Sequence, residues 1–271
     1  MLFRSLPTRP EKPNRDPSAA VLIGLWLIWR LAPFVPHFDL GKLKSALRPL
    51  FDPQIEAGAV LLYLTYWLVV SQALSALVSR PHLLEALLLL IAGVLAGRLI
   101  VANQAFVPEE LLALVLLLPI VALLYRMTSR PRRLLLVASM LVAFVVERLA
   151  PFNFTGPPAN FDFWPFLHWF EAGLSTSLQS VDWSAFFGLL FLLGAVLWVI
   201  RYSGATFNFA AGLLLGLVLV TEVLQLWLPG RTGSLTDPLL ALGIVALFRY
   251  TQRRQRRAFS GRPISRRGHT L

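Results

Sequence analysis

Residues 57–79 read AGAVLLYLTYWLVVSQALSALVS, a run without a single charged side chain. Two further runs, 82–102 and 206–228, have a similar length and contain at most two charges each. A bilayer core about 30 Å thick needs roughly 20 apolar residues per helical crossing, because an α-helix rises about 1.5 Å per residue. These runs predict membrane-spanning helices, and they recur too often to be one anchor on a soluble domain.

The composition of the whole chain agrees with this interpretation. Of the 271 residues, 56% are hydrophobic and 14% are charged, and the mean hydropathy is +0.67. A soluble domain usually has about 25% charged residues. Alternating segments of about ten residues, which mark a membrane β-barrel, are absent. We therefore expect an all-α integral membrane protein.

The positions of the basic residues predict the topology. Both tails and the even-numbered connections are basic, most clearly at 126–133, which has four arginines and no acid. Because Lys and Arg accumulate in cytoplasmic loops, we expect both termini in the cytoplasm and a location in the bacterial inner (cytoplasmic) membrane. The net charge of +11 then reflects topology, not nucleic-acid binding. The predicted crossings are 18–34, 57–79, 82–102, 109–126, 133–150, 182–200, 206–228 and 236–250.

Three polar segments are expected to lie outside the crossings. Residues 1–17 form a cytoplasmic N-terminal tail, and 127–132 form a basic cytoplasmic linker. The tail 251–271 is too poor in apolar residues to form a core, so we expect it to be disordered. Its arginines are suited to bind anionic lipid headgroups; the alternative is that they act only as a topology determinant.

Two short motifs occur twice at corresponding places. The sequence RLAPF at 30–34 recurs at 148–152, and LLAL at 111–114 recurs at 239–242. Each RLAPF copy lies at the end of one predicted crossing and is followed by three more. The pattern predicts two parallel four-helix repeats, a first half at 18–126 and a second half at 133–250.

An aromatic-rich segment, 160–180, is broken by Pro165 and is too short and polar to span a bilayer. Aromatic rings concentrate at the headgroup level of membranes. We expect a short interfacial or re-entrant helix on the outer side, with a simple aromatic anchor as the alternative.

No signature of a soluble nucleotide-binding or hydrolytic enzyme is present. Cysteine is absent, and none of the four histidines is expected to have a carboxylate or second histidine at helical spacing. No metal or other cofactor is therefore expected.

Charged residues within or at the ends of the predicted crossings are few. Placing a charge at bilayer depth costs roughly 2.5–3.5 kcal/mol on insertion scales, so each needs a partner or a function. For Arg98 the sequence leaves two partners open, Glu222 or the pair Glu109–Glu110. The charged residues are Arg30, Glu85, Arg98, Glu147, Arg148 and Glu222.

The densest polar group lies around the turn between the last two crossings. Glu222 and Gln225 are three residues apart and share one helix face. Pro229-Gly230 predicts a turn that contains Arg231, and Asp237 lies where its carboxylate suits a helix start. One interpretation is a ligand site near the outer surface; the alternative is a salt-bridged helical hairpin.

The run Glu222-x-x-Gln225-x-x-x-Pro229-Gly230-Arg231, followed by Asp237, resembles the VanZ-like membrane protein family. The upstream Arg148-x-x-Pro151-Phe152-Asn153-Phe154 and Trp164-Pro165-Phe166 resemble the same family, and the resemblance covers about 140–250. The family name comes from a protein associated with low-level resistance to the glycopeptide teicoplanin. The resemblance therefore implies a cell-envelope setting, without a firmly assigned reaction.

We expect an outward-facing polar pocket that recognises an amphipathic envelope molecule, such as a lipid-linked saccharide or cell-wall precursor. In this hypothesis the arginines bind phosphate or carboxylate groups. Two alternatives remain: a membrane enzyme with Glu222 or Asp237 as general acid/base, and a structural or assembly protein. The candidate binding residues are Glu222, Gln225, Arg231, Asp237, Arg148 and Asn153.

Overall fold

The computed structural model describes residues 16–32, 34, 40–101, 105–156, 161–165 and 183–260. This part of the chain is helical, with turns, loops and an isolated β-bridge that joins Asp162 to Ser234. Five of its helices are long and apolar enough to cross a membrane. The expected class, a helical membrane protein of multi-pass character, is confirmed at this level.

A helix lies on each of the eight ranges that the hydrophobic pattern predicted. The helices that meet the length and hydropathy criteria for a crossing are α3, α4, α5, α8 and α9. The bounds are α1 (Pro17–Leu31), α3 (Ala57–Ser75), α4 (Leu83–Ile100), α5 (Pro108–Arg126), α6 (Ser129–Leu149), α8 (Trp183–Tyr202), α9 (Phe207–Gln225) and α10 (Thr236–Ser260).

Side chains next to the helices define two of their starts. The Oδ1 atom of Asp16 accepts a hydrogen bond from the Ser18 amide at 3.0 Å and so caps α1, whose first residue is Pro17. Thr206 caps α9 in the same way, through the Phe209 amide. Such caps satisfy amide groups that have no partner within the helix.

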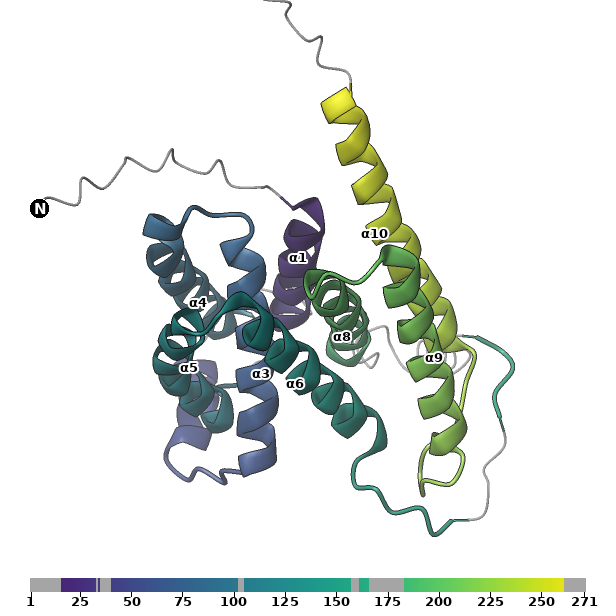
Figure 1. Ribbon diagram of the computed structural model, residues 1–271. Coiled ribbons are helices and arrows are strands. Elements are labelled where there is room, and N and C mark those ends of the chain that lie inside the picture. Colours follow the sequence, from purple (N-terminus) through teal and green to yellow (C-terminus); the bar gives the residue numbers. More distant parts are fainter. Residues whose placement is uncertain are drawn as a thin grey trace, which may run out of the picture.

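Four helices form the middle of the molecule and two pairs flank them. Figure 1 shows α1, α3, α6 and α8 in the centre, α4 and α5 on one flank, and α9 and α10 on the other. Direct contacts join α1 to α8, α3 to α6, and α6 to α8. The candidate site lies where the central helices meet α9 and α10.

Aromatic rings pack at the centre of the bundle. The ring centroid of Trp26 on α1 lies 5.1 Å from that of Trp67 on α3 and 4.9 Å from that of Phe191 on α8. All three side chains are fully buried. Since aromatic pairs at these distances add to the free energy of burial, this cluster fixes the positions of three helices.

Two predicted boundaries need correction. Helix α10 continues to Ser260, ten residues into the segment 251–271 that we expected to be a disordered tail. Arg and Gln are good helix formers, so a polar extension in water remains helical. Helix α6 begins at Ser129, so most of the predicted linker 127–132 is also helical.

The two long connections also differ from expectation. The first contains a short helix, α2 (Leu40–Leu47), and a 3-10 turn, Arg48–Leu50. Of the predicted interfacial helix at 160–180, residues 161–165 are described, and they form a bridge and a turn. The remainder of that prediction lies outside the described residues.

Glycine allows close packing between α1 and α8. A Cβ atom added to Gly188 would lie 2.7 Å from Nε1 of Trp29, whereas one added to Gly212 on α9 would meet nothing within 4 Å. We expect Gly188→Ala to lower the free energy of unfolding by about 1–3 kcal/mol through overpacking. Thermal unfolding in detergent measures this effect. If Gly212→Ala, the matched control, destabilises the protein as much, the packing account is wrong.

Candidate functional site

Arg148, at the end of α6, binds two carboxylates from two other helices. Its Nη2 atom lies 2.7 Å from Oε1 of Glu222 on α9, and the same atom forms an ion pair with Asp237 at the start of α10. Glu222 is 2% exposed and Arg148 16%. We call these three residues the Arg148 cluster. It joins α6, α9 and α10 at one point.

Gln225 completes the polar contacts of this cluster. Its Oε1 atom accepts a hydrogen bond from Arg148 Nη2 at 3.4 Å, and its Nε2 donates to the backbone carbonyl of Arg148 at 2.9 Å. Glu222 and Gln225 share one helix face, as their spacing predicted. The amide thus holds both the side chain and the backbone at the end of α6.

The turn between α9 and α10 supplies a further donor. The Ser234 amide donates to Oε2 of Glu222 at 2.6 Å, so both carboxylate oxygens of Glu222 have partners. Gly230 has a φ of +75°, which favours glycine, and a Cβ at Gly233 would lie 2.8 Å from the Glu222 carbonyl oxygen. These two glycines allow the turn to fold back onto α9.

Two predicted binding residues, Arg231 and Asn153, lie outside the Arg148 cluster. Arg231 donates from Nη2 to the carbonyl oxygen of Ala150 at 3.2 Å. Asn153 is exposed and accepts a hydrogen bond from the Thr155 hydroxyl at 2.8 Å. Among the described residues, neither bonds to a side chain of the Arg148 cluster or to Gln225.

A cavity of about 310 Å³ lies beside Arg148, between α1, α3, α6 and α8. Arg148 and Glu147 contribute to its wall from α6, and Ser184 contributes from the first turn of α8. The full lining is Trp29, Tyr66, Glu147, Arg148, Ser184, Ala185, Gly188, Leu189 and Leu192. We call this space the central cavity; it combines charged, hydroxyl, aromatic and aliphatic groups.

Glu147 gives the central cavity an unneutralised carboxylate. The Tyr66 hydroxyl donates to Oε1 of Glu147 at 2.8 Å. In the described part of the chain Glu147 has no ion-pair partner; it is exposed and lines the cavity. A carboxylate of this kind is able to accept hydrogen bonds from hydroxyl or ammonium groups of a ligand.

The first half contains a comparable charge cluster around Glu110, at the start of α5. Glu110 forms ion pairs with Arg30 from α1 and, at 2.5 Å, with Arg98 from α4. Trp67 donates from Nε1 to Oε1 of Glu110 at 3.1 Å. Of the two partners left open for Arg98, the structure therefore selects the Glu109–Glu110 pair, through Glu110.

The Glu110 cluster is closed, unlike the Arg148 cluster. The side chains of Arg30 and Arg98 are 4% and 5% exposed, and that of Glu110 is 1% exposed. The guanidinium carbon of Arg30 also lies 5.2 Å from the Trp26 ring centroid. Because no side of this cluster borders the central cavity, we interpret it as structural.

Sequence reasoning missed several contributors to the site. Glu147 was recognised as an intramembrane charge but not assigned a role, and Tyr66, Ser184 and the Ser234 amide were not considered. Nothing in the sequence places Tyr66 near Glu147, 81 positions away. The sequence did contain one signal for a role of Glu147: it is next to Arg148, and two adjacent charges are unusual in an apolar helix.

One expectation about the histidines was wrong. His82 and Glu85 are three residues apart at the start of α4, and Nδ1 of His82 lies 3.2 Å from Oε2 of Glu85. Both side chains are exposed. Among the described residues, no group of three or more His, Cys, Asp or Glu side chains is arranged to hold a metal ion.

Removing the carboxylate of the Glu110 cluster leaves two buried arginines without their anion. We expect Glu110→Gln to lower the free energy of unfolding by about 3–5 kcal/mol, the usual effect of breaking a buried ion pair. Thermal unfolding and the yield of folded protein measure this. Glu109→Gln is the matched control, and equal effects of the two substitutions would contradict the assignment.

Comparison of the chain with protein-family models, curated proteins and solved structures found no match. The resemblance to the VanZ-like family, and the glycopeptide-resistance role that it implies, therefore have no support from these comparisons.

Proposed function

We propose that this chain is a cytoplasmic-membrane protein that binds the headgroup of an amphipathic cell-envelope molecule in the central cavity. The substrate class is a lipid-linked saccharide or a related cell-wall precursor. Glu147 and Ser184 bind headgroup hydroxyls. The Nη2 atom of Arg148 is held by Glu222, Asp237 and Gln225, and its other guanidinium nitrogens meet a phosphate or carboxylate. The apolar residues of the lining face the lipid portion.

The proposal places the eight helices of the predicted crossings across the membrane, with both termini in the cytoplasm. Helix α1 is short, and α6 and α10 carry polar turns, but each has an apolar stretch that lies within the bundle. With the four arginines at 126–133 in the cytoplasm, the ends of α1 and α6 and the starts of α8 and α10 face the outside. The central cavity then opens toward the outer leaflet.

Two related halves are part of the proposal. In support, Phe34 and Phe152, the last residues of the two RLAPF motifs, both have a φ of +61°. The arginine of each motif, Arg30 or Arg148, pairs with a carboxylate at the start of the fourth helix of its half. The matching backbone conformation and the similar ion pairs in the two halves favour a duplication.

The observation that carries the functional proposal is the Glu147 carboxylate at the wall of the central cavity. An intramembrane charge is costly, so one without a neutralising partner indicates a function. The Glu110 cluster shows how this chain buries a charge when the role is structural. The Glu110 carboxylate is surrounded by Arg30, Arg98 and Trp67. Glu147, in contrast, is exposed at the wall of the cavity, and its hydrogen-bond partner is the Tyr66 hydroxyl.

A membrane enzyme with Glu222 or Asp237 as general acid/base is the less favoured alternative. A general base must reach the proton that it abstracts. Both oxygens of Glu222 already accept hydrogen bonds, from Arg148 and the Ser234 amide, and Asp237 is paired with Arg148. Neither carboxylate lines the central cavity. The contacts favour a role for these two residues in positioning Arg148 over acid/base chemistry.

The test is binding of a polyprenyl-pyrophosphate disaccharide by the purified protein, with the sugar-free polyprenyl pyrophosphate as the comparison ligand. Loss of a charge-assisted hydrogen bond costs about 1.5–3 kcal/mol. We therefore expect Glu147→Gln to weaken binding of the disaccharide about tenfold to a hundredfold. The dissociation constant, measured by native mass spectrometry, reports the change.

Glu109→Gln is the matched control, because Glu109 is also an acid in the membrane part of the chain but does not line the cavity. It should leave the dissociation constant unchanged. Equal affinity of the wild type for the sugar-free carrier, or equal effects of the two substitutions, would contradict the proposal.

A further inference from the structure

A second polar cavity lies far from the Arg148 cluster, where α9 begins. Its volume is about 380 Å³, and it lies between the first turn of α9 and the polar part of α10. Figure 1 shows α10 running on past the start of α9. The lining contains two arginines and no carboxylate: Thr206, Phe207, Asn208, Arg249, Gln252 and Arg253.

Arg249 and Arg253 present two like charges on one face of α10. They are four residues apart, and like charges at this spacing repel each other. Both are exposed, and in the described part of the chain neither forms an ion pair. An anion between the two guanidinium groups would offset this repulsion and accept hydrogen bonds from both.

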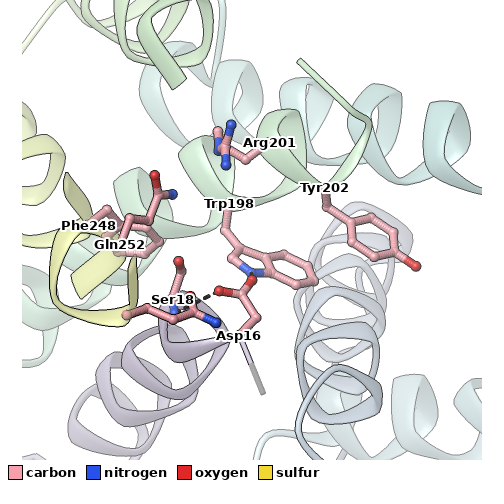
Figure 2. Close-up of a pocket in the computed structure, with 8 residues that line it drawn as sticks. Asp16, Ser18, Trp198, Arg201, Tyr202, Phe248 and Gln252 are labelled. Carbon is pink, nitrogen blue, oxygen red and sulfur yellow. Dashed lines mark hydrogen bonds between the residues drawn. The ribbon is translucent and has the colours of Figure 1, made fainter. Parts of the chain in front are cut away.

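The adjacent cavity contains an acid, Asp16, that is held by two hydrogen bonds. Gln252 lines both cavities, and the neighbouring one, of about 210 Å³, also contains Asp16. Figure 2 shows Asp16 beside Ser18 and Trp198. Its two carboxylate oxygens accept hydrogen bonds from the Ser18 amide and, at 3.2 Å, from Trp198 Nε1. In the part of the chain that the structure describes, Asp16 forms no ion pair with the arginines of α10.

The start of α9 adds donors to the same cavity. Its first turn contains no acidic residue, and the amides of a helix N-terminus favour an anion. Arg201 supports this position: Nη1 donates to the Ala205 carbonyl at 3.1 Å, and the guanidinium lies 5.8 Å from the Phe207 ring centroid. The loop that precedes α9 is thereby held against the end of α8.

Exposed apolar side chains occur on the same two helices as the lining of this cavity. Phe209 is 61% exposed, Tyr250 is 61% exposed and Leu247 is 40% exposed. Exposed apolar and aromatic groups next to arginines are typical of the level where a bilayer meets water. A ligand that fits both the arginines and the exposed apolar side chains carries a phosphate and hydrocarbon chains.

We propose that this cavity binds the phosphodiester of an anionic glycerophospholipid. Arg249 and Arg253 bind the phosphate from α10, and Asn208 donates to the headgroup from the first turn of α9. The acyl chains lie along Phe209 and Leu247. This site shares no residue with the central cavity, and its binding chemistry is the same on either face of the membrane. The lipid proposal can therefore be wrong while the proposed function is right, and the reverse.

The test uses the full-length protein in detergent with an equal mixture of phosphatidylglycerol and phosphatidylcholine of the same acyl chains. Native mass spectrometry measures the lipid that the protein retains. We expect the wild type to retain phosphatidylglycerol preferentially. Because an arginine near a membrane surface contributes a modest electrostatic attraction, we expect Arg249→Gln and Arg253→Gln each to reduce this retention roughly fivefold.

Arg254→Gln is the matched control, because Arg254 is exposed on the same helix but does not line the cavity. It should leave retention unchanged. An equal loss in this control, or no preference for phosphatidylglycerol in the wild type, would overturn the proposal. Inorganic phosphate is added in a separate arm. If it displaces the lipid at similar concentration, the site binds free phosphate and the lipid assignment is wrong.

Discussion

A charge inside a membrane requires an opposite charge or a ligand, and this requirement organises the protein around two arginines. Arg30 and Arg148 each lie at the end of a helix and each pair with a carboxylate at the start of a later helix. Such pairs contribute little net stability, but breaking one leaves an uncompensated buried charge. These ion pairs therefore determine which helices lie together, and they contribute little to the free energy of unfolding.

The two clusters differ in composition, and the difference suggests a division of roles. The Glu110 cluster has two arginines for one carboxylate and is enclosed by Trp26 and Trp67. The Arg148 cluster has one arginine for two carboxylates and borders the central cavity, where Glu147 adds another carboxylate. In our account the first cluster joins helices, and the second orients Arg148 toward a ligand.

The sequence predicted the helices well because each crossing needs a long apolar run, which is a local property. It also predicted that Glu222 and Gln225 share a face, and that a turn brings Asp237 near them. It did not predict the contact between Tyr66 and Glu147, because the central cavity forms between helices that are distant in the chain. The helical extension of α10 was missed because low hydrophobicity was read as disorder, although Arg and Gln favour a helix.

The central claim is that the cavity beside Arg148 opens to the outside while the Glu110 cluster is closed. The natural absence of cysteine allows a direct test, since a single introduced thiol has no background. Ser184→Cys places that thiol in the cavity wall, and Ala113→Cys places it in a buried position one turn from Glu110. Labelling of intact spheroplasts with a membrane-impermeant methanethiosulfonate should modify Ser184→Cys and leave Ala113→Cys unmodified. Modification of Ser184→Cys only after permeabilisation, or equal modification of both, would contradict the account.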